Sequence, residues 1–363
     1  MPEPRSAPDA ESGPGPEGPA PSEKPAAPVP SQPDPDPPTE ERRRLLRLPH
    51  RPRLPRLSRL RAATAITTAL LVAVGGTLAA IWRTGGFGSA PDPDLKQVPA
   101  AYHGLAGSLP WPDSGETALW AQGVGSLGTC GDQTPVPIAS VAKVMTAYVI
   151  LKDHPLAEGR PGPTIAVDRQ AETESFSRDE SSAPVRAGQQ LSERSLLELM
   201  LIPSANNVAR LLARWDAGDK DAFVAKMNAA AAELGMTNTT YTDPSGFDSA
   251  TVSTATDQLL LAESALTDPT LLALTAEPST QVPGDPAVLP NTDSLLGSDG
   301  VVGGKTGSST PAGGALMWAA HRDLKGVDHL VLGVVLHEDS GTTPERGLSA
   351  ALVSSRLLMQ AMR

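Results

Sequence analysis

Apolar residues are distributed unevenly along the chain. Residues 1–41 consist mainly of Pro, Ala, Glu, Asp, Ser and Gly, whereas residues 62–82 are 21 consecutive positions without a charged side chain. From residue 101 to the C-terminus, apolar residues recur at helical or strand spacing. The pattern predicts a disordered tail over 1–61, a transmembrane helix over 62–82, a linker over 83–100 and one folded domain over 101–363.

The folded domain is predicted to combine helices with an antiparallel sheet. Strand patterns occur at 117–123, 126–130, 315–321 and 329–337, and a turn containing Lys325 and Gly326 separates the last two. Helical patterns occur at 140–152, 196–201, 208–215, 223–234 and 344–362, and the first of these is expected to be amphipathic. The order of elements indicates an α/β (α+β) fold in which helices flank the sheet and an all-α subdomain is inserted.

Composition supports the separate tail. Of the 37 prolines, 17 lie in the first 60 residues, which contain no Phe, Trp or Tyr. Residues 1–41 carry nine acids and two bases, and residues 42–61 carry nine arginines and no acid. The arginines resemble a nucleic-acid patch, but they lack aromatic side chains for base stacking and precede the apolar segment. We therefore expect no nucleic-acid partner.

The length of the apolar segment matches a bilayer. A helix of 21 residues spans about 31 Å at 1.5 Å per residue, close to the thickness of the hydrocarbon core. Nine arginines precede the segment and Arg83 follows it, which predicts a cytoplasmic N-terminus and an extracytoplasmic folded domain in the cell membrane. A cleaved signal peptide ending near Ala90 is the alternative, but the segment exceeds the usual signal core of about 15 residues.

Cysteine and histidine usage indicates neither a disulfide framework nor a metal site. The one cysteine, Cys130, has no intrachain partner and is expected to be a small buried hydrophobe. The six histidines lack metal-ligand spacing, and His321, His329 and His337 are interpreted as polar ends of predicted strands. No metal and no cofactor is predicted.

Three short motifs carry candidate chemistry. Ser140 and Lys143 are three residues apart and would share one helix face, where the amine can act as a base for the hydroxyl. Alone, this pair also fits a helix cap, since about 0.7 such pairs are expected by chance. Ser204 and Asn206 form a second motif, and 305–307 reads Lys-Thr-Gly. All three together have a chance expectation of about 0.02, so a shared function is favoured.

In this order, the motifs resemble those of the penicillin-recognising serine enzymes, S-x-x-K, S-x-N and K-T-G. Five longer stretches are similar to D-alanyl-D-alanine carboxypeptidases of the low-molecular-mass penicillin-binding protein type: 137–147, 234–240, 243–248, 253–257 and 300–307. The resemblance covers residue 101 to the C-terminus and implies a β-lactamase/DD-peptidase-like fold. Ala205 and Asn207 depart from it, because the family commonly has Gly and Asp there.

The resemblance implies a role for each motif residue. Ser140 would be the nucleophile, with Lys143 as its base. Ser204 would relay the proton to the leaving amine, and Asn206 would orient Lys143 and the substrate amide.

The resemblance also implies a substrate-binding strand. Lys305 and Thr306 would hold the terminal carboxylate, and Gly307 would let the substrate approach closely. The amides of Ser140 and Ser308 would form the oxyanion hole. Arg346 is a further carboxylate-binding candidate, and a solvated arginine at a helix start is the alternative.

The resemblance implies a serine-type D-Ala-D-Ala carboxypeptidase that acts on peptidoglycan stem peptides and is acylated by β-lactams. A DD-transpeptidase, a β-lactamase and a catalytically silent cell-wall-binding protein are alternatives. A β-lactamase needs a glutamate for deacylation, and no Glu-x-x-x-Asn segment lies between Ser204 and Lys305. Asp179 and Glu180 are interpreted as part of a loop over the site, without a role in acid catalysis.

Overall fold

The computed structural model describes residues 97–362, which belong to the second of two compact units of the chain, Ala73–Arg363. The predicted tail at 1–61, the predicted transmembrane helix at 62–82 and most of the linker at 83–100 lie outside the described residues. Between residues 97 and 362, no helix is long and apolar enough to cross a membrane.

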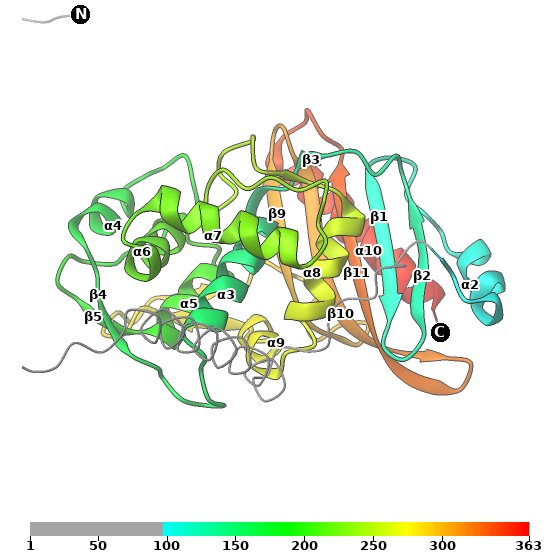
Figure 1. The fold of residues 1–363 in the computed structure, drawn as a ribbon, viewed down its shortest axis with the longest axis horizontal. Helices are drawn as coiled ribbons and strands as arrows, with labels where there is room; N and C mark the ends of the chain where they lie inside the picture. Colours follow the sequence, from blue (N-terminus) through cyan, green and yellow to red (C-terminus); the bar gives the residue numbers. More distant parts are fainter. Residues whose placement is uncertain (1–96, 363) are drawn as a thin grey trace, which may run out of the picture. The chain divides into compact units, whose positions relative to one another are not determined.

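A five-stranded antiparallel sheet forms the centre of the described unit (Figure 1). Its order is β2-β1-β11-β10-β9. The strands are β1 Glu116–Ala121, β2 Gly125–Cys130, β9 Val301–Ser309, β10 Gly313–Leu324 and β11 Val327–Glu338. The four predicted strands correspond to β1, β2, β10 and β11, and two hairpins join them as expected.

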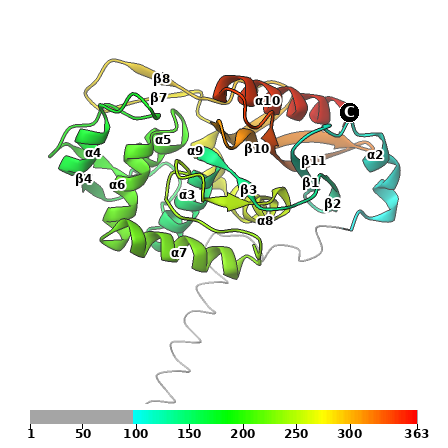
Figure 2. The same cartoon turned by 90° about the horizontal axis from the view of Figure 1, so that it is seen from above.

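Both faces of the sheet are buried, because helices cover each of them. In β10, Leu316 and Trp318 pack in one apolar cluster with α10, Pro344–Ala361, while Met317 packs in a second cluster with the other helices. Successive residues of a strand point to opposite faces, so one strand serves both clusters. Figure 2 shows α10 on one face and α8, Ala255–Ala265, on the other.

A group of helices lies beside the β9 edge of the sheet (Figure 1). Its central helix is α3, Ala142–Asp153, and the predicted amphipathic character of this helix is wrong. Every residue from 142 to 151 is buried, because α5, α6, α7 and α8 surround the helix. A helix that is surrounded on all sides has no solvent-facing side on which polar residues could gather.

The other predicted helices are α5 Glu193–Leu201, α6 Asn206–Ala217 and α7 Lys220–Glu233, besides α10. Side chains cap several starts: Ser192 accepts from the amide of Ser195 before α5, and Asp219 accepts from that of Ala222 before α7. The remaining elements are η2 Ala100–Tyr102, α2 His103–Ser108, β3 Val136–Pro137, η3 Ala139–Val141, β4 Thr164–Ala166, α4 Arg169–Glu174, β5 Gln190–Ser192, β6 Val252–Ser253, α9 Pro269–Thr275, β7 Ser279–Gln281 and β8 Val288–Pro290.

The strand β9 was not predicted from its apolar pattern. It contains Gly303, Gly304 and Gly307, and glycine has low strand propensity. The glycines are needed because β9 packs closely against its neighbours. A Cβ on Gly304 would lie 2.5 Å from the carbonyl oxygen of Met317, and one on Gly307 would lie 2.9 Å from that of Ile138.

The expectation for Cys130 is modified, whereas that for three histidines agrees with the fold. Cys130, at the end of β2, is only partly buried, because its place at the edge strand leaves one side uncovered. His321 and His329 lie on paired strands at the end where β10 turns into β11, and His337 lies near the other end of β11. The three therefore do not converge, in agreement with their interpretation as polar strand residues.

Candidate active site

The turn η3 and the first residues of α3 bring Ser140 and Lys143 together. Lys143 Nζ lies 2.8 Å from Ser140 Oγ, 2.5 Å from Asn206 Oδ1 and 2.9 Å from the carbonyl oxygen of Ser245. The Lys143 side chain is fully buried, whereas Ser140 is partly exposed. A buried amine thus contacts a hydroxyl that a ligand can reach.

The turn before α6 positions the second motif. Asn206 is the first residue of α6, and Ser204 has a φ of +66°, which turns the chain sharply into the helix. Ser204 is 5 % exposed, and its Oγ has no hydrogen-bond partner among residues 97–362. A buried hydroxyl without a partner lowers the stability of the fold, so its retention points to a functional role.

The carbonyl of Ser245 belongs to a loop that the Asp243 carboxylate holds together. The amides of Ser245, Gly246 and Phe247 and the hydroxyl of Thr251 donate to this carboxylate. The loop packs on η3, where a Cβ on Gly246 would collide with the carbonyl oxygen of Ala139. Residues 243–248 carried part of the family resemblance, but no role for Ser245 was predicted.

The surroundings of Lys143 favour its neutral amine. Burial lowers its pKa well below the usual value, and the positive charges of Lys305 and Arg210 act in the same direction. The carboxylates of Asp243 and Glu180 oppose them. An amine with a lowered pKa can accept the hydroxyl proton of Ser140 near neutral pH.

The edge strand β9 carries the third motif. Lys305 and Thr306 are 1 % and 3 % exposed, and the Oγ1 atoms of Thr306 and Thr292 are 2.5 Å apart. Lys305 Nζ donates to the carbonyl oxygen of Thr306 over 3.1 Å. Burial lowers the pKa of Lys305 to about 7, although the Asp293 carboxylate raises it.

A cavity of about 670 Å³ opens at these elements. Its lining includes Ser140, Asn206 and Ser308, together with Glu180 and Phe247. Lys143, Lys305 and Thr306 are buried behind this surface. The amide nitrogen of Ser140 faces β9 closely, because a Cβ on Gly307 would lie 3.1 Å from it.

Arg346 is separate from this group. It lies in the first turn of α10, its side chain is 70 % exposed, and its Nε donates to Asp339 over 2.9 Å. Its neighbours Pro344 and Glu345 line the cavity, but Arg346 does not. The observed position favours the alternative of a solvated arginine at a helix start.

The loop over the site contains a residue whose contact was not predicted. Asn206 Nδ2 donates to Glu180 Oε2 over 2.8 Å, and Arg210 donates to both oxygens of that carboxylate. The spacing of Glu180 from the three motifs carried no signal for this contact. Asn207, the departure from the family pattern, anchors the same loop, since its Oδ1 accepts from the amide of Ala183 and its Nδ2 donates to that residue's carbonyl.

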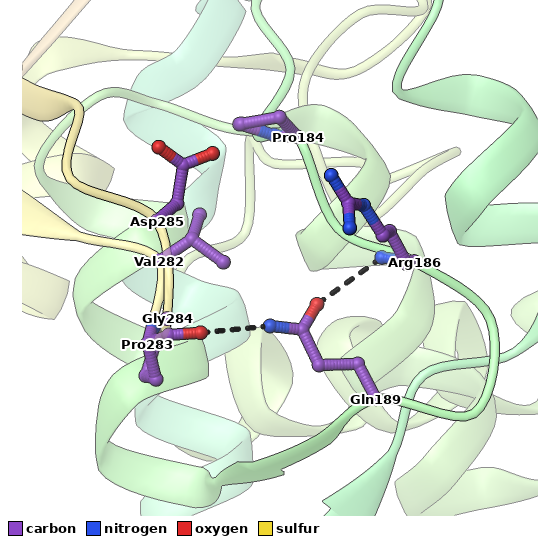
Figure 3. Close-up of a pocket in the computed structure, with 7 residues that line it drawn as sticks. All are labelled: Pro184, Arg186, Gln189, Val282, Pro283, Gly284 and Asp285. Atoms are coloured by element: carbon purple, nitrogen blue, oxygen red, sulfur yellow. Dashed lines mark hydrogen bonds between the residues drawn. The ribbon is translucent and has the colours of Figure 1, made fainter.

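A second cavity of about 330 Å³ lies between the segment before β5 and the β7–β8 hairpin (Figure 3). One of its polar side chains links the two walls: Gln189 accepts from the amide of Arg186 and donates to the carbonyl oxygen of Pro283. None of the residues around it is a serine, cysteine or lysine. The first cavity is therefore the candidate active site.

Comparisons with known proteins agree with this site. A family model described as D-alanyl-D-alanine carboxypeptidase matches residues 128–336, which include all three motifs. D-alanyl-D-alanine carboxypeptidase DacB2 of Mycobacterium tuberculosis is 36 % identical over 227 residues, covering 60 % of this chain and 74 % of the relative. A D-alanyl-D-alanine endopeptidase of Pseudomonas aeruginosa is 46 % identical, but over only 34 % of this chain and 37 % of that protein.

Solved structures share the fold. The crystal structure of D-alanyl-D-alanine carboxypeptidase from Mycobacterium tuberculosis superposes with a TM-score of 0.56 at 30 % identity, covering 68 % of this chain and 93 % of that one. The predicted arrangement of an antiparallel sheet with helices is thereby confirmed.

Proposed function

Because the chain belongs to the D-alanyl-D-alanine carboxypeptidase family, we propose that it releases the terminal D-alanine from peptidoglycan stem peptides through a serine-linked acyl-enzyme. The observation that carries the proposal is the contact of buried Lys143 Nζ with Ser140 Oγ, Asn206 and Ser245 at the wall of one cavity. It pairs a nucleophile with a base whose pKa is lowered.

In the acylation step, Ser140 Oγ attacks the carbonyl carbon of the penultimate D-alanine and its proton passes to Lys143. The amides of Ser140 and Ser308 stabilise the oxyanion, and the Ser140 ester forms as the peptide C–N bond breaks. The leaving amine takes a proton relayed through Ser204. The buried Ser204 hydroxyl, which has no partner among the described residues, supports this role.

The strand β9 recognises the substrate. Lys305 and Thr306 hold the terminal carboxylate, and Gly307 leaves room for the peptide beside the strand. The positive charge of Lys305 is available at and below neutral pH, since its pKa is about 7. The side chain of Arg346 faces Asp339 and is assigned no part in this binding.

Water then hydrolyses the ester and regenerates Ser140. β-Lactams acylate the same serine and inhibit the enzyme, as the family resemblance implies. The lack of a Glu-x-x-x-Asn segment between Ser204 and Lys305 argues against rapid β-lactam hydrolysis. The assembled Ser140–Lys143 pair argues against a silent wall-binding protein.

The direct test is release of D-alanine from a pentapeptide ending in D-Ala-D-Ala, using the full-length chain in detergent. We expect turnover by the wild type, labelling by a fluorescent penicillin, and loss of both in Ser140→Ala. Ser249→Ala is the matched control, because Ser249 lines the same cavity without contacting Lys143. Labelling that persists in Ser140→Ala would remove Ser140 as nucleophile.

The proposed location is the cell membrane, with one transmembrane helix at 62–82, a cytoplasmic N-terminus and an extracytoplasmic catalytic domain. The uncharged segment and the nine arginines before it support this orientation. It also brings the active site to the compartment that contains peptidoglycan.

A further inference from the structure

The loop between α4 and β5 places one carboxylate beside the catalytic group. Glu180 lines the active-site cavity together with Ser140 and Asn206, and its side chain is 9 % exposed. The loop is tied to α6 at this point, because the amide of Asn206 donates to the carbonyl oxygen of Ser181 over 2.8 Å. The position of Glu180 is therefore determined by the same helix that carries Asn206.

The partners of Asn206 determine which way its side-chain amide points. Lys143 Nζ donates to Oδ1 over 2.5 Å, but a neutral amine has a lone pair and can also accept, so this contact alone leaves both orientations of the amide open. On the other side, Nδ2 lies 2.8 Å from Glu180 Oε2, and an ionised carboxylate can only accept. The reversed amide would place its oxygen against the Glu180 carboxylate, where neither group can donate. Glu180 thus opposes rotation of the Asn206 amide.

Arg210 holds Glu180 in this position. Its Nη1 and Nη2 donate to Oε2 and Oε1 of Glu180 over 3.0 and 2.6 Å, and its Nε donates to Glu174 over 2.8 Å. Such bidentate pairs fix geometry as well as charge. Asn206 and Arg210 are four residues apart on α6, so one helix face supports the whole arrangement.

We propose that Glu180 is a positioning residue for the carboxypeptidase reaction: it holds the Asn206 amide so that Oδ1 faces Lys143 and one N–H stays available to the substrate. The amide nitrogen has two hydrogens, and Glu180 accepts only one of them. This proposal rests on the proposed function, since it concerns the same acyl transfer.

The charge of Glu180 also affects the base. Burial lowers the pKa of Lys143. The positive charges of Lys305 and Arg210 lower this pKa further, whereas the carboxylates of Asp243 and Glu180 raise it. Removal of the Glu180 charge leaves Arg210 less compensated, so the pKa of Lys143 falls. The acylation rate rises with pH as Lys143 loses its proton. In the variant, this rise is therefore expected at a lower pH.

The test measures the rate of Ser140 acylation by a fluorescent penicillin, and D-alanine release, across pH in the full-length chain. For Glu180→Ala we expect a loss of about 10- to 100-fold in the acylation rate, mainly in kcat for the peptide, because the Asn206 amide is no longer held. Glu180→Gln keeps the size of the side chain but loses the charge, so a smaller loss and the same shift to lower pH are expected.

Glu174→Gln is the matched control, since Glu174 also binds Arg210 but does not contact Asn206. It is expected to keep the wild-type pH profile and a rate within about threefold. Thermal unfolding midpoints identify any variant that fails to fold. If Glu180→Ala does not fold, Glu180→Gln tests the role of Glu180.

A folded Glu180 variant whose acylation rate and pH profile match those of Glu174→Gln would overturn the proposal. Failure of the proposed function has a different result: the wild type would be labelled by penicillin but would release no D-alanine. The effect of Glu180 on acylation is measured independently of that release.

Discussion

Two buried lysines of the site differ in their neighbours, and the neighbours determine what each can do. Lys143 faces a hydroxyl, an amide oxygen and a backbone carbonyl, and its pKa is well below the usual value, mainly because it is buried. Lys305 has the Asp293 carboxylate nearby, which keeps its pKa at about 7 despite complete burial. The first suits a base and the second a carboxylate-binding cation.

Asp293→Asn is expected to weaken substrate binding near neutral pH. Loss of the carboxylate lowers the pKa of Lys305, so a smaller fraction of Lys305 is charged at pH 7. We expect the KM for the pentapeptide to rise by about 3- to 10-fold at pH 7 and by less at pH 5.5, where a larger fraction of Lys305 is charged in both proteins. Asp285→Asn, in the second cavity, is the control; an equal KM for the wild type and Asp293→Asn at pH 7 would contradict this role.

A second prediction concerns Glu193, at the start of α5. The residue is completely buried, neither carboxylate oxygen has a hydrogen-bond partner among the described residues, and burial raises its pKa to about 7. A raised carboxyl pKa favours the protonated form, so its contribution to stability is complete below the unfolded pKa of 4.5 and is lost as pH rises through 7.

Glu193→Gln should remove this loss. Equal stabilities are expected near pH 4.5, and the variant should be more stable by about 1–3 kcal/mol at pH 8.5, measured by urea unfolding at each pH. Glu158→Gln, at an exposed position, is the control. A constant difference between wild type and Glu193→Gln across this range would show that Glu193 does not titrate as proposed.

At the scale of elements, the site depends on how closely β9 approaches η3. Gly307 makes this contact possible, because a Cβ there would lie 2.9 Å from the carbonyl oxygen of Ile138 and 3.1 Å from the amide nitrogen of Ser140. These are backbone atoms that cannot move aside without displacing the nucleophile.

Gly307→Ala is therefore expected to reduce penicillin acylation by about 100-fold, because it displaces Ser140 relative to β9. Gly104→Ala in α2 is the matched control, since nothing lies within 4 Å of its Cβ position. The control should keep full acylation and gain about 0.5–1 kcal/mol of stability. Normal acylation of Gly307→Ala would mean that β9 and η3 can separate without cost.

A second element, α6, connects the site to the surrounding loop. Asn206, Arg210 and Arg214 are spaced four residues apart on one face and bind Glu180, Glu174 and Asp168. Arg214 forms two hydrogen bonds with Asp168, the capping residue of α4. This face of α6 therefore holds both ends of the segment from α4 to the catalytic cavity.

In the whole molecule, the site lies where the sheet edge meets the group of helices. Residues as far apart in sequence as Ala139 and Glu345 line one cavity, and one apolar cluster contains both Leu332 of the sheet and Leu211 of α6. A continuous core of this kind fixes the positions of the two sides of the cavity relative to each other.

The membrane anchor is the prediction at this scale. The full-length chain should sediment with membranes and resist extraction by alkaline carbonate, because about 21 uncharged residues can span the bilayer. A variant that lacks residues 1–90 should be found in the soluble fraction. Recovery of the full-length chain in the soluble fraction would exclude an uncleaved transmembrane helix.

Local patterns determined much of this picture. The hairpins β1–β2 and β10–β11 and the helices α5, α6, α7 and α10 follow from apolar spacing, because each buries a face that the spacing defines. The first two motifs identified Ser140, Lys143 and Asn206, which the fold brings into contact.

Tertiary structure alone decided the remaining features. The strand β9 has glycines where strand propensity favours larger side chains, and only its close packing against α9, β10 and η3 explains them. The burial of α3, the Ser245 carbonyl on Lys143 and the Glu180 contact with Asn206 join segments far apart in sequence. Residue spacing carries no information about such contacts, because they depend on how complete elements pack together.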